Sequence, residues 1–299
     1  MQERIHGAAR SPEPMIGALE LAEAMSAAER PVVVDVRWQL GRGFAGNHAD
    51  YVEGHLPGAA FLDLETGLSG RPGPHGGGRH PLPSLTAASD AFRAAGVADG
   101  RPVVFYDDST SLAAARAWWV LRYFGHEDVR VLDGGFAGWV AAGLPWTTGG
   151  YLPSRGDVTL RRGSLHAVEA SEIEHDRHPG ALLDARAGER YRGEVEPLDP
   201  VAGHIPGAVS VPTLALLRTD GRLQPHRLAA VLDDRGVDPA EAATLYCGSG
   251  VQAAHLALTW RAAFPAAPEP ALYVGSWSDW VSDSGREVAV GQEPRVTST

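Results

Sequence analysis

The sequence contains only one cysteine, Cys247, among its 299 residues. A single thiol cannot form an intrachain disulfide, and it cannot build a zinc or iron–sulfur site that needs several cysteines. Scarcity of cysteine suits a reducing compartment. The thiol of Cys247 is therefore either a small core side chain or a reactive group.

Long apolar runs are also lacking. Residues 1–9 are interrupted by charges and have no apolar segment of signal length, and no run of about eighteen apolar residues occurs elsewhere. We therefore expect a cytoplasmic protein with no membrane segment.

Positive charge is in short supply: 26 lysines and arginines stand against 37 aspartates and glutamates, for a net charge of −11. An acidic surface repels phosphate groups, so nucleic acid and anionic membranes are poor partners, and an anionic substrate needs a local basic pocket. The chain has no His-Glu-x-x-His spacing, and its glycine run at 73–78 lacks the lysine of a phosphate-binding loop. We predict no metal and no cofactor.

Four short motifs occur twice in the same order. They are the pairs 31–37 and 181–186, 54–59 and 203–208, 103–107 and 243–247, and 134–139 and 275–280. The first two pairs lie 149 residues apart and the last two 140 and 141, so a loop is shorter in the second copy. The Gly/Pro-rich stretch 69–83 is the place where we expect the difference.

The duplication predicts two domains, an inactive one at 1–150 and a catalytic one at 151–299, divided within the turn-rich segment 146–156. Each copy alternates short β-branched runs with Ala/Leu-rich segments of helical spacing. This alternation predicts an α/β fold with a mostly parallel sheet flanked by helices in each domain. About residues 285–299 are expected to form a poorly fixed tail.

Cys247 stands where an apolar strand at 243–246 meets a Gly-Ser-Gly loop and then a helix. Backbone N–H groups and the positive end of the helix dipole can face the sulfur in that setting, which favours the thiolate. The first copy has Asp107 at the equivalent position. Because a core filler would not align with aspartate, we interpret Cys247 as functional and the first copy as inactive.

The repeated Asp-x-Arg and Gly-His-x-Pro-Gly-Ala motifs and the loop Cys247-Gly-Ser-Gly-Val251 resemble the two-domain rhodanese-like sulfurtransferases over nearly the whole chain. The resemblance implies tandem rhodanese-like domains and sulfur transfer through a persulfide on Cys247. Thiosulfate-using members typically carry basic residues where Gly248 and Ser249 stand, so the neutral loop resembles the 3-mercaptopyruvate branch. A small-molecule sulfur donor and a thiol acceptor such as thioredoxin or a small thiol, or cyanide, are the partners it implies.

The resemblance also implies the binding residues. Arg190 matches the family's substrate-binding arginine, and its planar fork suits a carboxylate. Arg186 is a second candidate, although its twin Arg37 in the inactive copy favours a structural ion pair. The family's second arginine, in a Pro-Glu-Pro-Arg text, is missing from 196–200, which leaves Arg192 as its candidate substitute. The loop residues expected to bind the sulfur anion and the substrate are Gly248, Gly250, Val251 and Gln252.

Ser249, His80 and Asp63 match a serine–histidine–aspartate relay proposed for the 3-mercaptopyruvate branch. His80 and Asp63 come from the inactive copy, which gives that domain a part in the site. The alternative for His80 is a solvated loop histidine. His55 and His204 recur in both copies, so we interpret them as structural.

Three other functions compete with this hypothesis. A thiosulfate sulfurtransferase would keep the chemistry and change the donor. A cysteine-dependent phosphatase would need an arginine six residues after the cysteine, where the chain has Ala253. A non-enzymatic sulfur carrier is disfavoured by the complete cysteine loop of the second copy.

Overall fold

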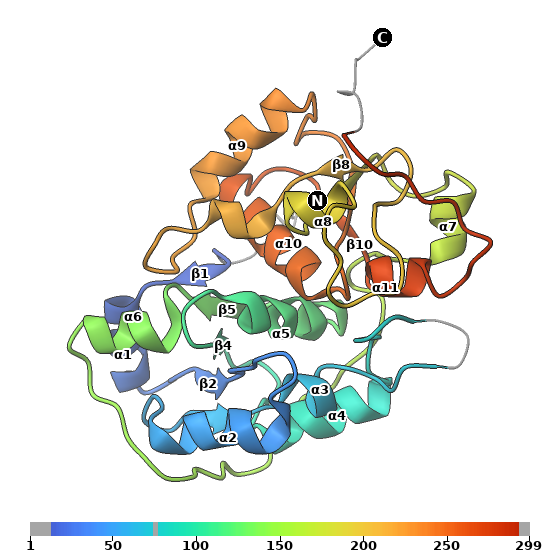
Figure 1. Cartoon of the computed structure of the whole chain (residues 1–299). Coiled ribbons are helices and arrows are strands. Elements are labelled where there is room, and N and C mark those ends of the chain that lie inside the picture. Colours follow the sequence, from blue (N-terminus) through green and yellow to red (C-terminus); the bar gives the residue numbers. More distant parts are fainter. Residues whose placement is uncertain (1–12, 74–76, 293–299) are drawn as a thin grey trace, which may run out of the picture.

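β-Branched and aliphatic runs form the strands of two parallel sheets, and alanine-rich segments form the helices that cover them (Figure 1). The computed structural model describes residues 13–73 and 77–292. The elements of the first half are β1 (Met15–Ile16), α1 (Ala18–Ser26), β2 (Val32–Asp35), α2 (Gly43–Glu53), β3 (Ala60–Phe61), α3 (Leu64–Gly67), α4 (Leu85–Ala94), β4 (Val103–Tyr106), α5 (Leu112–Tyr123), β5 (Val129–Leu132) and α6 (Gly135–Ala141). Those of the second half are β6 (Ala167–Val168), α7 (Ala170–Glu174), β7 (Ala181–Asp184), α8 (Gly188–Tyr191), β8 (Val209–Ser210), η1 (Thr213–Leu216), α9 (Pro225–Asp234), β9 (Ala243–Tyr246), α10 (Val251–Ala263), β10 (Ala271–Tyr273) and α11 (Ser276–Trp280).

The two sheets have the same order, β1-β5-β4-β2-β3 and β6-β10-β9-β7-β8, and every strand pair is parallel. The central strands β2, β4 and β9 are buried at every residue, because helices cover both faces of a parallel sheet. The α/β fold and the duplication are therefore confirmed. We use "N-terminal domain" and "C-terminal domain" for the parts around the first and second sheet.

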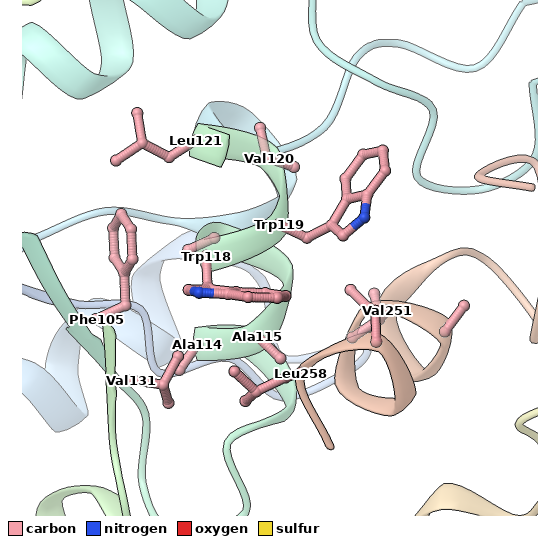
Figure 2. Packing of buried hydrophobic residues seen from close by; sticks show 14 of the residues in the cluster. Phe105, Ala114, Ala115, Trp118, Trp119, Val120, Leu121, Val131, Val251 and Leu258 are labelled. Atoms are coloured by element: carbon pink, nitrogen blue, oxygen red, sulfur yellow. The ribbon is translucent and has the colours of Figure 1, made fainter. Parts of the chain in front are cut away.

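Helices α5 and α10 form the centre of the contact between the domains. α5 is buried from Ala113 to Leu121, and α10 is buried at most of its length. The two helices contact each other along their buried lengths, and Figure 2 shows Trp118 of α5 toward the N-terminal sheet, where its Nε1 donates to the carbonyl of Val129. One hydrophobic cluster includes residues of both domains, so the domains share a core.

The segment between the domains, 143–166, runs along the N-terminal domain. The Gly149 N–H donates to the carbonyl of Val52, and the Gly156 N–H donates to that of Arg93. Residues on both sides of 150 therefore contact the N-terminal domain. The domain division at 150 and 151 stays a prediction.

The first copy has a longer connection before its fourth helix, as the repeat offsets indicate. Seventeen residues, 68–84, separate α3 from α4, whereas eight residues, 217–224, separate η1 from α9. Residues 77–80 of this insertion lie against the C-terminal domain, because the Arg79 N–H donates to Ser278 Oγ (3.0 Å) and the Gly77 N–H donates to Asp279.

The expectation of a poorly fixed tail from 285 is wrong for residues 285–292. Ala289 and His204 exchange two backbone hydrogen bonds (2.8 and 2.9 Å), and Trp280 Nε1 donates to the carbonyl of Glu287. Residues 293–299 lie outside the described residues. None of the helices within 13–73 and 77–292 has the length and apolar character needed to span a bilayer.

Candidate active site

Cys247 lies in the turn between β9 and α10, at the carboxyl edge of the second sheet. The turn is tight because Gly250, the N-cap of α10, has φ +82°, a conformation that favours glycine. The Gly250 N–H donates to Cys247 Sγ (3.1 Å), and Ser276 Oγ lies 3.9 Å from the sulfur. The backbone therefore offers the sulfur an N–H donor at the N-terminus of a 13-residue helix, as the sequence predicts.

Helix α11 holds this turn from behind. The Trp277 N–H donates to the carbonyl of Cys247 (2.9 Å), and the Ser278 N–H donates to that of Gly248 (3.0 Å). The Cys247 N–H donates to Ser276 Oγ (3.1 Å). These three hydrogen bonds fix the backbone around Cys247, which limits the directions in which its Sγ atom can point.

The thiol lies at a small cavity between the domains. Cys247 is 1% exposed, but it lines a cavity of about 180 Å³. The lining residues are Trp38, Leu40, Arg79, His80, Leu112, Arg190, Leu198, Cys247, Gly248, Ser249, Val251 and Gln252. Both domains contribute to the cavity, and its polar groups include two guanidinium groups and an imidazole.

Ser249, His80 and an acidic residue form a hydrogen-bonded series across the domain boundary. Ser249 Oγ lies 2.8 Å from His80 Nδ1, and His80 Nε2 lies 3.2 Å from Glu65 Oε1. Because a carboxylate only accepts, Nε2 carries the proton, and Nδ1 accepts from the serine hydroxyl. Burial lowers the pKa of His80, an effect that Glu65 opposes.

The carboxylate beside His80 is thus Glu65, where we expected Asp63. Asp63 is the N-cap of α3, and its Oδ1 accepts from the backbone N–H and the hydroxyl of Thr66 (3.0 and 2.9 Å). The residue at the N-cap points its side chain to the helix start, so the acidic residue two positions later reaches the histidine. Trp38 Nε1 also donates to Glu65 (2.9 Å).

Two arginines meet over Gly248, one from each domain. A Cβ atom built on Gly248 would lie 3.0 Å from Arg79 Nη2 and 3.4 Å from Arg190 Nη1. Arg190 donates to Glu196 (2.6 Å) and contacts Asp199 (3.3 Å), and Arg79 also pairs with Asp199. The resulting Arg79–Arg190–Glu196–Asp199 cluster carries two positive and two negative charges beside the thiol.

The two carboxylates of this cluster differ in their proton affinity. Burial raises the pKa of Asp199, and Arg79 offsets this only in part. Burial acts in the same direction on Glu196, but the hydrogen bond and charge of Arg190 and the backbone N–H donors of Leu198 and Asp199 together outweigh it and hold the pKa of Glu196 below its usual value. The ionised form of Asp199 is therefore less stabilised than that of Glu196. An incoming anion can more readily displace Asp199 than Glu196 from the arginines.

Arg186 and Arg192 do not line the cavity. Arg186 is completely buried, donates to both oxygens of Asp184 and to the Gly203 carbonyl, and lies over the Trp277 ring. Arg37 repeats this geometry with Asp35 in the first domain. Arg192 is paired with Glu194 at the surface (2.7 Å). Neither Arg186 nor Arg192 contributes a free guanidinium to a substrate in this structure.

The other predicted loop residues have distinct places. Gly250 donates to the sulfur, whereas Gly248, Val251 and Gln252 line the cavity. Within the described part of the chain, no group of three or more His, Cys, Asp or Glu side chains is arranged to hold a metal ion.

Glu65, Arg79 and Asp199 are not among the residues that the sequence predicts for the site. Glu65 follows Asp63 by two residues and Arg79 precedes His80 directly, so nearness to the candidates was a usable signal. No residue pattern beyond that nearness distinguished them, because the contacts of Glu65 with His80 and of Arg79 with Asp199 are made only by the tertiary fold.

Known proteins resemble this chain in sequence and in fold. A family model described as the rhodanese-like domain matches residues 18–142 and again 167–283. "Putative thiosulfate sulfurtransferase SseB" of Mycobacterium tuberculosis is 43% identical over 281 residues, which is 93% of this chain and 97% of that protein. "Probable 3-mercaptopyruvate sulfurtransferase" of Pseudomonas aeruginosa is 43% identical over 286 residues, which is 93% of this chain and 98% of that protein. The crystal structure of SseA from Escherichia coli, described with the 3-mercaptopyruvate sulfotransferases, has a TM-score of 0.76 at 32% identity and covers 89% of this chain and 100% of its own.

The chain belongs to the rhodanese-like family, with one domain of that family in each half. It is a sulfurtransferase, since proteins of this class match it over nearly their whole length. The two relatives at 43% identity carry names with different sulfur donors, so similarity alone does not select the donor.

Proposed function

We propose that this sulfurtransferase takes sulfane sulfur from 3-mercaptopyruvate and passes it, through a persulfide on Cys247, to a thiol or to cyanide. The observation that carries the choice of donor is the Arg79–Arg190–Glu196–Asp199 cluster beside a neutral cysteine loop. The two carboxylates already cancel the charge of both arginines, which favours a donor with one carboxylate over the dianion thiosulfate. A cavity of about 180 Å³ suits a donor of this small size.

In the first step the Cys247 thiolate attacks the sulfur of the donor. A bond forms between the two sulfur atoms, the carbon–sulfur bond breaks, and its electron pair remains on the carbon as the enolate of pyruvate. A proton then converts the enolate to pyruvate, and the protein keeps a Cys247 persulfide. In the second step an acceptor thiolate attacks the outer sulfur and releases the Cys247 thiolate.

The charged and polar groups of the cavity have separate tasks in this scheme. Arg190 and Arg79 bind the donor carboxylate, and the Gly250 N–H stabilises the sulfur anion. Ser249 can donate its hydroxyl hydrogen either to His80 Nδ1 or to the donor carbonyl, and Glu65 fixes the orientation of the neutral His80. Asp63 acts on this site only indirectly, through the start of α3.

The acceptor is a thiol that can reach a cavity with walls from both domains, which includes small thiols and an exposed thiol of a protein such as thioredoxin. A reducing cytoplasmic setting suits this proposal, because Cys247 has to return to the thiolate after each turnover.

Intact mass and steady-state kinetics test the proposal. The wild-type protein is expected to gain one sulfur atom with 3-mercaptopyruvate, and Cys247→Ser to gain none. The value of kcat/KM is expected to be at least about tenfold higher for 3-mercaptopyruvate than for thiosulfate, the equivalent of about 1.4 kcal/mol. Labelling of Cys247→Ser would overturn the covalent scheme, and a preference for thiosulfate would overturn the donor.

A further inference from the structure

Arg116 of α5 is a completely buried guanidinium group in the N-terminal domain. Its Nη2 donates to the carbonyl of His80 (2.8 Å) and lies 3.3 Å from that of Leu68 and 3.4 Å from that of Pro81. Its Nε and Nη1 have no hydrogen-bond acceptor, and no carboxylate pairs with it within the described part of the chain. Removing an unpaired cation from water is strongly unfavourable, so this arrangement needs a compensating anion.

The unpartnered side of Arg116 faces the cysteine loop. A Cβ atom built on Gly250 would lie 3.0 Å from Arg116 Nη1, and the Gly250 N–H is the donor to Cys247 Sγ. Burial lowers the pKa of Arg116 to about 10, and the negative charge of Cys247 acts in the opposite direction. Arg116 is therefore still protonated at pH 7, and its charge acts on the sulfur through a low-dielectric interior.

The other cationic groups around the loop are paired with carboxylates or are neutral. Arg79 and Arg190 are paired with carboxylates, and burial lowers the pKa of His80 so that the ring is neutral at pH 7. The acidic groups behind them are Glu65, Glu196, Asp199 and Asp279, each bonded to a partner already. Among the described residues that surround the loop, Arg116 is the cation whose charge no carboxylate cancels.

We propose that Arg116 is a positioning residue through which the cysteine-less domain stabilises the anionic sulfur of Cys247, as thiolate and as persulfide. Its Nη2 holds the His80 segment against the site, while its uncancelled charge faces the loop that binds the sulfur. The persulfide part of this inference rests on the proposed function, whereas the thiolate part does not. The proposal also gives a physical reason why the N-terminal domain is needed for the chemistry.

The test compares Arg116→Gln with Arg116→Lys, because both can donate to the His80 carbonyl and only lysine keeps the charge. The measurement is the rate of Cys247 alkylation by iodoacetamide against pH. We expect the Gln variant to shift this profile to higher pH by about one unit or more, and the Lys variant to stay closer to wild type. Arg122→Gln is the matched control, since Arg122 lies on the same helix and pairs with Glu269; its profile is expected to be that of wild type.

Thermal melting checks that the variants fold. If neither variant folds, the salt dependence of the wild-type alkylation profile tests the proposal instead. Because a buried charge is not screened, the wild-type profile is expected to be the same at low and high salt. A folded Gln variant with the wild-type profile, or a wild-type profile that moves with salt, would overturn the proposal. Alkylation needs no sulfur donor, so failure of 3-mercaptopyruvate to load the protein would contradict the proposed function and leave this test intact.

Discussion

Two acidic residues, Asp63 and Glu65, lie two positions apart and have different partners. The carboxylate of Asp63 accepts from the first turn of α3, and the carboxylate of Glu65 accepts from the imidazole and from Trp38. A capping carboxylate contributes to stability, whereas a carboxylate on a histidine fixes its tautomer and orientation.

The pair provides a prediction with an internal control. Glu65→Gln is expected to lower kcat/KM for 3-mercaptopyruvate by about tenfold to a hundredfold, because His80 loses its charged partner. Asp63→Ala is expected to lower the free energy of unfolding by about 1 kcal/mol, from the lost cap, while the pH profile of kcat keeps its shape. Steady-state kinetics and urea denaturation measure both. An unchanged kcat/KM in Glu65→Gln would show that Glu65 makes no contribution to catalysis.

The arginines near the cavity give a second prediction at this scale. Arg79→Gln is expected to raise KM for 3-mercaptopyruvate by about tenfold, because one of the two guanidinium groups over Gly248 is lost. Arg192→Gln is the control, since Arg192 is paired with Glu194 at the surface. If both variants changed KM equally, the carboxylate site would not be formed by the two arginines that meet over Gly248.

At the scale of elements, the turns after β4 and β9 show how the same structure supports different chemistry. In the first domain the Asp107 carboxylate accepts from the backbone N–H groups of Ser111, Ala113 and Ala114 (2.9, 3.0 and 3.3 Å). In the second domain the same turn carries Cys247 and leaves its helix N-terminus facing the sulfur. An internal carboxylate thus occupies the anion-binding turn of the N-terminal domain.

Asp107 also makes a prediction about pH. Burial raises its pKa to about 6 from 3.8, although the three N–H donors oppose the shift. The folded state therefore binds more protons than the unfolded state between about pH 4 and pH 6, and the stability from this group is lost as pH rises through that window. Across it, the difference in unfolding free energy between Asp107→Asn and wild type should grow by about 2–3 kcal/mol in favour of the variant.

Urea denaturation at pH 4.5 and 7.5 measures this difference. Asp233→Asn, at an exposed position of α9, is the control and is expected to show no such trend. A constant difference between Asp107→Asn and wild type at both pH values would contradict the expected shift.

At the scale of the whole molecule, the site exists only where the two domains meet. The N-terminal domain contributes Arg79 and His80 to the cavity, with Glu65 bonded to His80 and Arg116 beside the Gly250 turn, and the C-terminal domain contributes Arg190 and the thiol. The insertion at 68–84 carries two of these residues across the boundary. The domain without a cysteine therefore lines the cavity that holds Cys247.

His255 of α10 gives the prediction at this scale, because it joins the domains. Its Nε2 donates to the Thr110 carbonyl (3.0 Å) in the N-terminal domain, and its Nδ1 accepts from Thr213 (2.6 Å). Burial lowers the pKa of His255 to about 4. The unfolded state binds more protons between pH 6.5 and 4, so stability from this group falls as pH falls through that window, by about 3 kcal/mol in total.

Thermal melting between pH 7 and pH 4.5 checks this. His255→Gln is expected to lose less stability over the range than wild type does, and His175→Gln, at an exposed position, is expected to follow wild type. Parallel loss in wild type and His255→Gln would show that acid sensitivity arises elsewhere.

Much of the architecture follows from the sequence, since strands buried on both faces need continuous apolar runs and a duplicated fold repeats its turn motifs. The cysteine loop was predictable for the same reason, because β9, Gly250 and the start of α10 are consecutive. The structural role of Arg186 was also foreshadowed, as its twin Arg37 lies in the copy without a thiol. The roles of Glu65 and Arg79 could not be predicted. No local pattern shows which of two nearby acids reaches His80, or that Arg79 pairs with Asp199 of the other domain.

The sequence by itself therefore determined the two parallel sheets, the duplication, and the thiol at a helix start, all of which depend on interactions between near neighbours in the chain. Only the tertiary structure decided which charges surround that thiol. The contacts of Arg79 with Asp199, of Glu65 with His80, and of Arg116 with the Gly250 turn depend on where the insertion and α5 pack against the second domain. Such long-range packing fixes distances and burial, and these quantities set the strength of every charge in the site.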